Sequence, residues 1–285
     1  MVAGRGDGKL LSVSPSSLTL AALVGASGCG GGIPLLHPAQ TLPLGDVRAA
    51  TGFSGNIVTA GFANALQSAI NEEPSGSGGA PSAPRTDSTY ARGALVAASA
   101  GPGLAPFVAA RVGIGSKVEA GIGYTGRAVR LDLRRSFDLP GRWALSVGAA
   151  GSAALYGHQD GTELADVDVG QMHGVGADVP VLLGYQSDAD LYLLWFGARG
   201  GWEHVDISEV TSEPGATELG PAPIALSATR WWAGGLVGAA VGFRHVHVAM
   251  ELDVDYASIS GSYNQTHAQV AGVMLTPGTA LWWKF

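Results

Sequence analysis

Apolar and polar residues alternate with a period of two along most of the chain after residue 100. The segment from Val246 to Tyr256 shows the pattern well. Its even positions are all apolar, and its odd positions hold His247, Glu251, Asp253 and Asp255, with Ala249 as the one apolar exception. Successive side chains of a β-strand point to opposite faces of a sheet. The segment is therefore predicted to be a strand with one apolar face and one charged face.

Turn-forming residues divide the chain into a series of such segments. Strands are predicted at 45–58, 90–100, 104–114, 118–124, 127–137, 143–156, 179–186, 191–204, 229–243, 246–258 and 269–285. Long polar loops are predicted at 158–174 and 206–225. Phe62, Leu66 and Ile70 recur every four residues and indicate a short helix, and 72–88 is rich in Pro, Gly and Ser. The whole predicts an all-β, antiparallel barrel of ten to twelve strands over 45–285, with a flexible insertion at 59–89.

The length of the strands favours a transmembrane barrel over a soluble one. Trp231 and Phe243 end one apolar face twelve residues apart, about 40 Å of strand at ~3.3 Å per residue. Tilted by about 40–45°, such a strand spans the hydrocarbon layer between its aromatic girdles. The girdle is assigned to Trp143, Tyr192, Trp202, Trp231, Phe243, Tyr256, Trp283 and Phe285. A soluble barrel would reverse the two faces, with the apolar rows as its core.

A mid-strand charge facing lipid would cost several kcal/mol, so the charged rows are assigned to the lumen. The candidate lumen or pore residues are Arg111, Glu119, Arg130, Asp132, Arg134, Arg199, Glu203, Glu251, Asp253 and Asp255. Two interpretations of this row stay open. The charges fill a narrow barrel as paired ions, or they line a water-filled path in which Glu251, Asp253 and Asp255 form a constriction that prefers cations.

The chain ends Leu281-Trp282-Trp283-Lys284-Phe285, with Phe285, Trp283 and Leu281 in one row. This terminal aromatic strand resembles the last strand of bacterial outer-membrane β-barrels, where it serves as the assembly signal. The resemblance implies an exported, porin-like protein of a Gram-negative outer membrane. Its implied partners are membrane lipids and the barrel-assembly machinery, which would engage the C-terminal strand.

The N-terminus is predicted to carry an export signal over residues 1–28, with Arg5 and Lys9 before an apolar run and small residues after it. Cys29 follows Ala26-Ser27-Gly28, a pattern that resembles a bacterial lipoprotein signal and implies acylation of Cys29. The alternative is ordinary cleavage after Ala26, which leaves a free thiol. Residues 29–44 are expected to form an irregular N-terminal tether.

Composition and motifs exclude several other classes of function. The net charge is −7 and no Lys/Arg cluster occurs, so no nucleic-acid partner is expected. A single cysteine cannot form an internal disulfide. No nucleotide-binding, metalloprotease or serine-hydrolase motif is present, and the acidic stretch 160–168 does not have EF-hand spacing. Histidines near strand ends, such as His204 and His247, have no defined spacing to Ser258 or Ser260. We therefore expect no enzyme, no metal and no cofactor.

Two functions follow from the sequence. The first is a passive small-solute channel with a charged lumen, which would make the protein a transporter. The second is a plugged structural or interaction barrel, an outer-membrane lipoprotein without transport activity.

Overall fold

The structure, a computed structural model of the chain, describes residues 32–59, 61–71, 87–154, 164, 172–207 and 225–285. The predicted signal at 1–28 and the proposed lipidation site Cys29 lie outside these residues. So do most of the predicted loops at 158–174 and 206–225.

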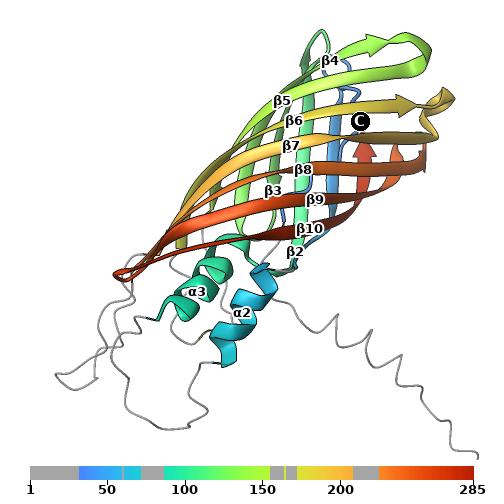
Figure 1. Cartoon of the computed structure of the whole chain (residues 1–285). Coiled ribbons are helices and arrows are strands. Elements are labelled where there is room, and N and C mark those ends of the chain that lie inside the picture. Colours follow the sequence, from blue (N-terminus) through green and yellow to red (C-terminus); the bar gives the residue numbers. More distant parts are fainter. Residues whose placement is uncertain (1–31, 60, 72–86, 155–163, 165–171, 208–224) are drawn as a thin grey trace, which may run out of the picture.

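The described residues form a closed antiparallel barrel of ten strands (Figure 1), as the alternating pattern predicts. The strands are β1 (Val47–Val58), β2 (Gly103–Gly115), β3 (Val118–Tyr124), β4 (Ala128–Leu139), β5 (Trp143–Ala154), β6 (Met172–Gln186), β7 (Tyr192–Ile207), β8 (Leu226–Phe243), β9 (Val246–Tyr263) and β10 (Thr266–Lys284). Each strand pairs with its neighbours in sequence, and β10 pairs with β1 to close the ring. Val47 and Phe285 complete the seam with two backbone hydrogen bonds, of 3.2 and 2.8 Å. No strand edge in the ring is left unpaired, which is the condition for a sheet in lipid.

The two ends of the barrel differ in their connections. At one end, which we call the terminal end, lie Val47, Phe285 and the short turns after β2, β4, β6 and β8. The opposite end, the loop end, holds the long connections after β1, β5 and β7. The helices α2 (Gly61–Asn71) and α3 (Ser88–Ala100) belong to the connection between β1 and β2 and lie at the loop end, away from the C-terminus (Figure 1). None of the described helices is long and apolar enough to span a membrane.

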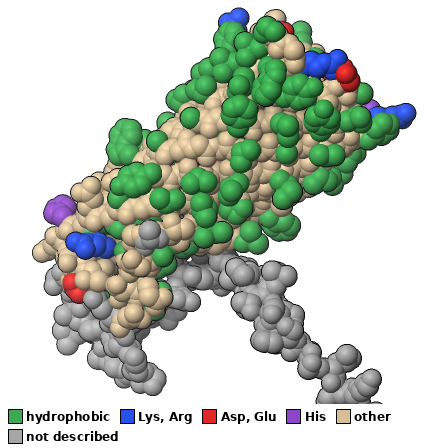
Figure 2. Space-filling view, turned by 45° about the vertical axis from the view of Figure 1, so that its right-hand side comes forward, with side chains coloured by type: hydrophobic (Ala, Val, Ile, Leu, Met, Phe, Trp, Pro, Cys, Tyr) green, Lys and Arg blue, Asp and Glu red, His purple; other side chains and the backbone are tan. Residues whose placement is uncertain are grey.

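The faces of the wall are arranged as a membrane barrel requires. Outward residues such as Met250, Val248 and Tyr256 on β9 are 54–65% exposed, whereas the inward Glu251 and Asp253 are 4% and 2% exposed. Figure 2 shows apolar side chains over the wall, with charged side chains near the two ends of the visible face. An apolar outer surface around a charged interior is unfavourable for a protein in water and favourable for a barrel in lipid.

The segment Tyr90–Ala100 was predicted as a strand, and that prediction is wrong: it belongs to helix α3. Alanine occupies both rows of the segment, so its apparent alternation carries little information, while alanine has the highest helix propensity. The local signals of a helix are present. Asp87 caps the first turn by accepting from the Thr89 amide at 3.0 Å, and Gly101 ends the helix in the left-handed conformation with φ 53°.

The connection 59–89 also differs from a purely flexible insertion. The short helix expected from Phe62, Leu66 and Ile70 is present as α2, and α2 packs against α3. Gly93 of α3 makes this packing close: a Cβ atom at that position would lie 2.3 Å from the Ala69 Cβ of α2. The two helices therefore form an antiparallel-packed unit that sits on one end of the barrel.

Strand β6 begins at Met172 and not at Val179. The predicted loop at 158–174 is shorter by three residues at its C-terminal side. This extension adds Asp178, a charged inward residue that the shorter predicted strand left out.

Candidate functional site: the filled lumen

Residues 32–44, which the sequence predicted as part of an irregular N-terminal tether, run through the inside of the barrel and leave it at Pro43 and Leu44. We call them the plug segment. Leu35, Leu36 and Leu42 are 2–3% exposed. Glycines on the inner wall leave space for the segment: a Cβ at Gly278 would lie 2.9 Å from the Pro34 Cβ, and one at Gly184 would lie 2.8 Å from the Ala39 Cβ.

The plug segment has no regular structure because proline interrupts it at positions 34, 38 and 43. Proline donates no backbone hydrogen bond and biases the preceding residue toward extended conformations. The remaining backbone groups must then bond elsewhere, since an unpaired buried amide or carbonyl is costly. Charged side chains of the barrel wall provide these bonds.

Glu251 on β9 holds the first half of the plug segment. Its carboxylate accepts from the backbone amides of Leu35, at 2.5 Å, and Leu36, at 3.0 Å. It also accepts from the indole Nε1 of Trp195 at 2.7 Å. Leu36 adopts φ 47°, an uncommon conformation for a bulky residue. This turn directs two successive amides at one carboxylate.

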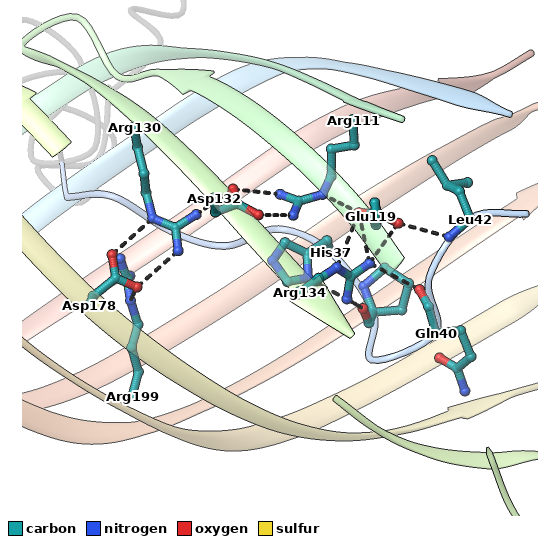
Figure 3. Close-up of polar contacts among 11 residues, drawn as sticks. His37, Gln40, Leu42, Arg111, Glu119, Arg130, Asp132, Arg134, Asp178 and Arg199 are labelled. Carbon is teal, nitrogen blue, oxygen red and sulfur yellow. Dashed lines mark hydrogen bonds and ion pairs between the residues drawn. The ribbon is translucent and has the colours of Figure 1, made fainter. Parts of the chain in front are cut away.

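Glu119 and Arg134 hold the second half (Figure 3). Glu119 Oε2 accepts from the Leu42 amide at 2.8 Å. The Arg134 guanidinium donates to the carbonyl of Pro38 and, at 3.0 Å, to that of Gln40, and it also binds Glu119 at 2.9–3.0 Å. One arginine therefore joins two plug carbonyls to a wall carboxylate, and the planar guanidinium suits this fork geometry.

A chain of ion pairs continues around the wall from these two residues (Figure 3). Arg111 binds both Glu119 and Asp132. Arg130 joins Asp132, at 2.8 Å, to Asp178, at 2.9 Å. Arg199 binds Asp178 at 3.0 Å and lies 3.6 Å from Asp253. Arginines and carboxylates alternate along this series of contacts, so each buried charge in it has an opposite charge beside it, as burial requires.

Helix α3 packs into the loop end of the barrel, against β7, β8, β9 and β10. Every residue from Ala94 to Ala100 is buried, and Tyr90 contacts Tyr263 of β9 edge-on with ring centroids 5.4 Å apart. Arg127, from the turn before β4, donates to the Ala98 carbonyl at 2.6 Å, and Asn56 of β1 donates to the Ala100 carbonyl. A cation and an amide at the last carbonyls of a helix satisfy its free acceptors and complement its dipole.

All ten candidate lumen residues have inward, largely buried side chains. Eight are 7% exposed or less, and the side chains of Asp132 and Glu203 are 6% and 13% exposed. Glu203 is not part of the series of ion pairs that runs from Arg134 to Asp253. It binds Arg230 and lies 3.8 Å from Arg127. The candidate girdle aromatics are on the outer wall, with Trp231, Phe243, Tyr256 and Phe285 62–73% exposed. Trp143, Tyr192, Trp202 and Trp283 are the less exposed members.

Sequence reasoning missed four inward charges: Asp178, Arg48, Arg127 and Arg230. Asp178 was hidden by the late start assigned to β6. Arg127 was predicted as the first residue of the strand 127–137, in the apolar row of Val129, whereas the structure places it in the turn before β4. Arg230 is in the alternate row to Trp231, and Arg48 in the alternate row to Val47, so the register of these two strands could have revealed them.

Two cavities border the plug segment and the charged wall in the described part of the lumen. A cavity of about 50 Å³ lies among Arg127, Asp178, Arg199, Trp232 and Asp255. A second, of about 220 Å³, opens at the terminal end. Among the described residues, no group of three or more His, Cys, Asp or Glu side chains is placed to hold a metal ion.

No family model and no curated protein sequence matches the chain. Its shape is similar to solved outer-membrane barrels. Neisserial surface protein A is 10% identical with a TM-score of 0.30, over 84% of this chain and 96% of that one. The outer-membrane protease OmpT from Escherichia coli is 10% identical with a TM-score of 0.37, over 87% and 100%. CymD, a monoaromatic hydrocarbon channel, is 10% identical with a TM-score of 0.21, over 92% and 98%.

The chain has the fold of an outer-membrane β-barrel. The ring closure, the apolar outer wall and the charged lumen establish this from the molecule itself. The neighbours have different titles, a surface protein, a protease and a channel, and with TM-scores of 0.21–0.37 they carry no argument about this chain.

Proposed function

We propose that this barrel is closed by its own chain and acts as a structural or interaction protein of the outer membrane, not as an open channel. The observation that carries the proposal is the plug segment, bonded at both halves to the wall through Glu251, Glu119 and Arg134. Helix α3 packs against the wall at the loop end of the same lumen.

The energetics of the lumen support closure. Removing the plug segment would leave Glu251 with only the Trp195 indole as a bonded partner. A buried group that loses a partner costs about 1–3 kcal/mol, and more if it is charged. Because several wall groups bind the plug together, opening would break several such bonds at once.

The same geometry weakens the channel interpretation of the acidic row. In the channel hypothesis, Glu251, Asp253 and Asp255 attract cations to a constriction. Glu251 is instead occupied by plug amides, and Asp253 lies 3.6 Å from Arg199. A carboxylate that is already neutralised by protein groups gives little selectivity to a permeating ion.

The loop end is the surface that would act in an interaction role. The α2–α3 unit covers it, and the long connections after β5 and β7 start from it. We further propose outer-membrane localisation, contact with membrane lipids through the exposed aromatics, assembly through the β10 strand, and acylation at Cys29. Metabolic labelling with palmitate, compared between the wild type and Cys29→Ser, tests the last of these.

Single-channel recording in a planar bilayer tests the closed state. The full-length barrel is expected to be silent, whereas a variant lacking residues 33–43 is expected to show more frequent and larger conductance events. A second variant, Glu119→Gln with Glu251→Gln, keeps the segment and weakens its bonds, and is expected to show intermittent opening. Asp138→Asn is the matched control, because Asp138 pairs with Lys117 at the exposed terminal end.

Folding of each variant is checked by electrophoresis in SDS before and after boiling, since a closed barrel shifts only when boiled. Steady ohmic steps from the folded full-length protein would contradict the proposal and restore the channel interpretation.

A further inference from the structure

A cavity at the terminal end of the barrel has the features of a small-ligand site. It has a volume of about 220 Å³ and lies where the plug segment leaves the lumen. Its wall combines the plug with the ends of five strands, β1, β6, β7, β9 and β10, and includes Gln40, Arg48, Asp190, His247, Trp282 and Lys284. The side chains of this wall do not hold the plug in place, but Gln40 belongs to the plug, so the inference rests on the closed lumen proposed above.

Two buried donors on this wall have no hydrogen-bond acceptor. They are Nη1 of Arg48 and Nε1 of Trp282, whose residues are 7% and 2% exposed. The Arg48 guanidinium lies over the Trp282 ring, 4.9 Å from its centroid, so the two side chains that carry these donors are in contact. Unsatisfied buried donors are uncommon in folded proteins and are expected to have a partner.

The neighbouring carboxylates are already used. Asp190 accepts from Lys284 Nζ at 3.3 Å and from the Gln186 amide. Glu119 is bound by Arg111, Arg134 and the Leu42 amide. His247 donates through Nε2 to the Asp190 carbonyl at 2.7 Å, which must be the acceptor of that pair. An acceptor for Arg48 Nη1 and Trp282 Nε1 therefore has to come from outside these groups.

Gln40, a residue of the same wall, has an unpaired acceptor. Gln40 Oε1 is buried without a partner, while Gln40 Nε2 donates to the Gly184 carbonyl at 3.1 Å. That bond fixes the orientation of the amide, because an exchange of Oε1 and Nε2 would place two oxygens together. A molecule that matches this wall carries an acceptor for Arg48 and Trp282 and a donor for Gln40.

We propose that this cavity binds a small carboxylate that also carries a hydroxyl or amino group, of the size of a hydroxy acid or an amino acid. Arginine binds carboxylates strongly through charge-assisted hydrogen bonds, and the indole N–H is a pure donor. A cavity of about 220 Å³ has room for a molecule of this size. Arg48 and Lys284 give the wall two cations against the one carboxylate of Asp190, so an anion is favoured.

Nuclear magnetic resonance of the tryptophan indole N–H groups tests the site in the full-length protein, with glycolate as the probe. The resonance that disappears in Trp282→Phe belongs to Trp282, and it is expected to move saturably as glycolate is added. Acetate, which lacks the hydroxyl, is expected to bind several-fold more weakly, and sodium chloride at equal ionic strength is expected to cause no saturable shift.

Calorimetric titration then compares variants whose folding is verified by the SDS shift. Arg48→Gln is expected to weaken glycolate binding by about tenfold or more, and Trp282→Phe by a few-fold, as expected for a charged and a neutral hydrogen bond. Arg244→Gln removes the same charge from an exposed turn at the same end and is expected to bind as the wild type does. If glycolate causes no saturable shift, or if Arg48→Gln and Trp282→Phe both bind it as tightly as the wild type, the proposal is wrong and the cavity holds water.

Discussion

The carboxylate of Glu251 accepts a hydrogen bond of 3.0 Å from the backbone amide of Leu36, a residue 215 positions away in the chain. This bond joins the ninth strand of the barrel to a segment that precedes the first. It shows how the lumen is closed: charged side chains of the wall bind the backbone of an irregular segment that has no sheet or helix partner of its own.

Replacing Glu251 by Gln is expected to loosen the first half of the plug segment. The amide side chain has nearly the same shape but loses the charge and one of the acceptor oxygens, and charged hydrogen bonds contribute about 1.5–3 kcal/mol each. Hydrogen exchange of the Leu35 and Leu36 amides should accelerate by about tenfold or more, while the β9 amides stay protected. Asp138→Asn, at the exposed end, serves as the control. Unchanged exchange at Leu36 would show that the plug is held by its apolar contacts.

Replacing Arg134 is expected to separate the roles of charge and geometry. Arg134 donates to Pro38, Gln40 and Glu119 at once, and lysine cannot reproduce this fork. Arg134→Lys should therefore destabilise the barrel nearly as much as Arg134→Gln, by about 3 kcal/mol for a broken buried pair. Urea unfolding of both variants in detergent measures the difference. A lysine variant as stable as the wild type would contradict the assigned geometry.

An arginine on the outer wall is expected to be costly in proportion to its depth. Met250 lies between the two girdles on β9 and is 65% exposed, whereas Val246 lies at the terminal end of the same strand. Met250→Arg should reduce the free energy of unfolding in lipid vesicles by about 2–4 kcal/mol, and Val246→Arg by about 0–1 kcal/mol. Equal, small effects at both positions would argue against a lipid environment.

A larger side chain at Gly93 is expected to push the two helices apart. A Cβ there would lie 2.3 Å from Ala69 Cβ and 2.9 Å from the Ala65 carbonyl oxygen. Gly93→Val should cost about 1–3 kcal/mol of packing and expose the α2 amides to hydrogen exchange, while the barrel keeps its SDS shift. The adjacent, exposed Arg92→Ala is the matched control. Full protection of α2 in Gly93→Val would show that the packing tolerates the added volume.

The turn after β6 is expected to weaken in acid through Asp190. Partial burial raises the pKa of this carboxyl. The hydrogen bond from Gln186 and the charge of Lys284 lower the pKa by more than burial raises it, so the pKa lies below its usual value. The stabilisation is complete above the unfolded pKa of about 3.9 and is lost as the pH falls below it. The difference in unfolding free energy between the wild type and Asp190→Asn should therefore shrink between pH 5 and pH 2. A difference that does not change with pH would exclude this carboxylate as the cause.

The sequence by itself determined the wall of this protein. The alternation from Val246 to Tyr256 predicts which side chains face lipid and which face inward. Successive side chains of a strand point to opposite faces, and a charged side chain costs several kcal/mol more in lipid than in the lumen. The terminal row of Phe285 and Trp283 likewise predicted a closing strand, which the structure pairs with β1. These are local patterns, readable one strand at a time.

Only the tertiary structure decided what fills the barrel. The plug segment has prolines and no periodicity, so nothing local distinguishes it from an external linker, and α3 has alanine in both of its rows. Their positions depend on bonds between distant residues, such as Leu36 with Glu251 and Ala98 with Arg127. Such pairings have no signature in a single sequence. Apart from proline, every residue has the same backbone N–H and C=O groups, so the sequence does not show which of them a distant charged side chain of the wall will bind.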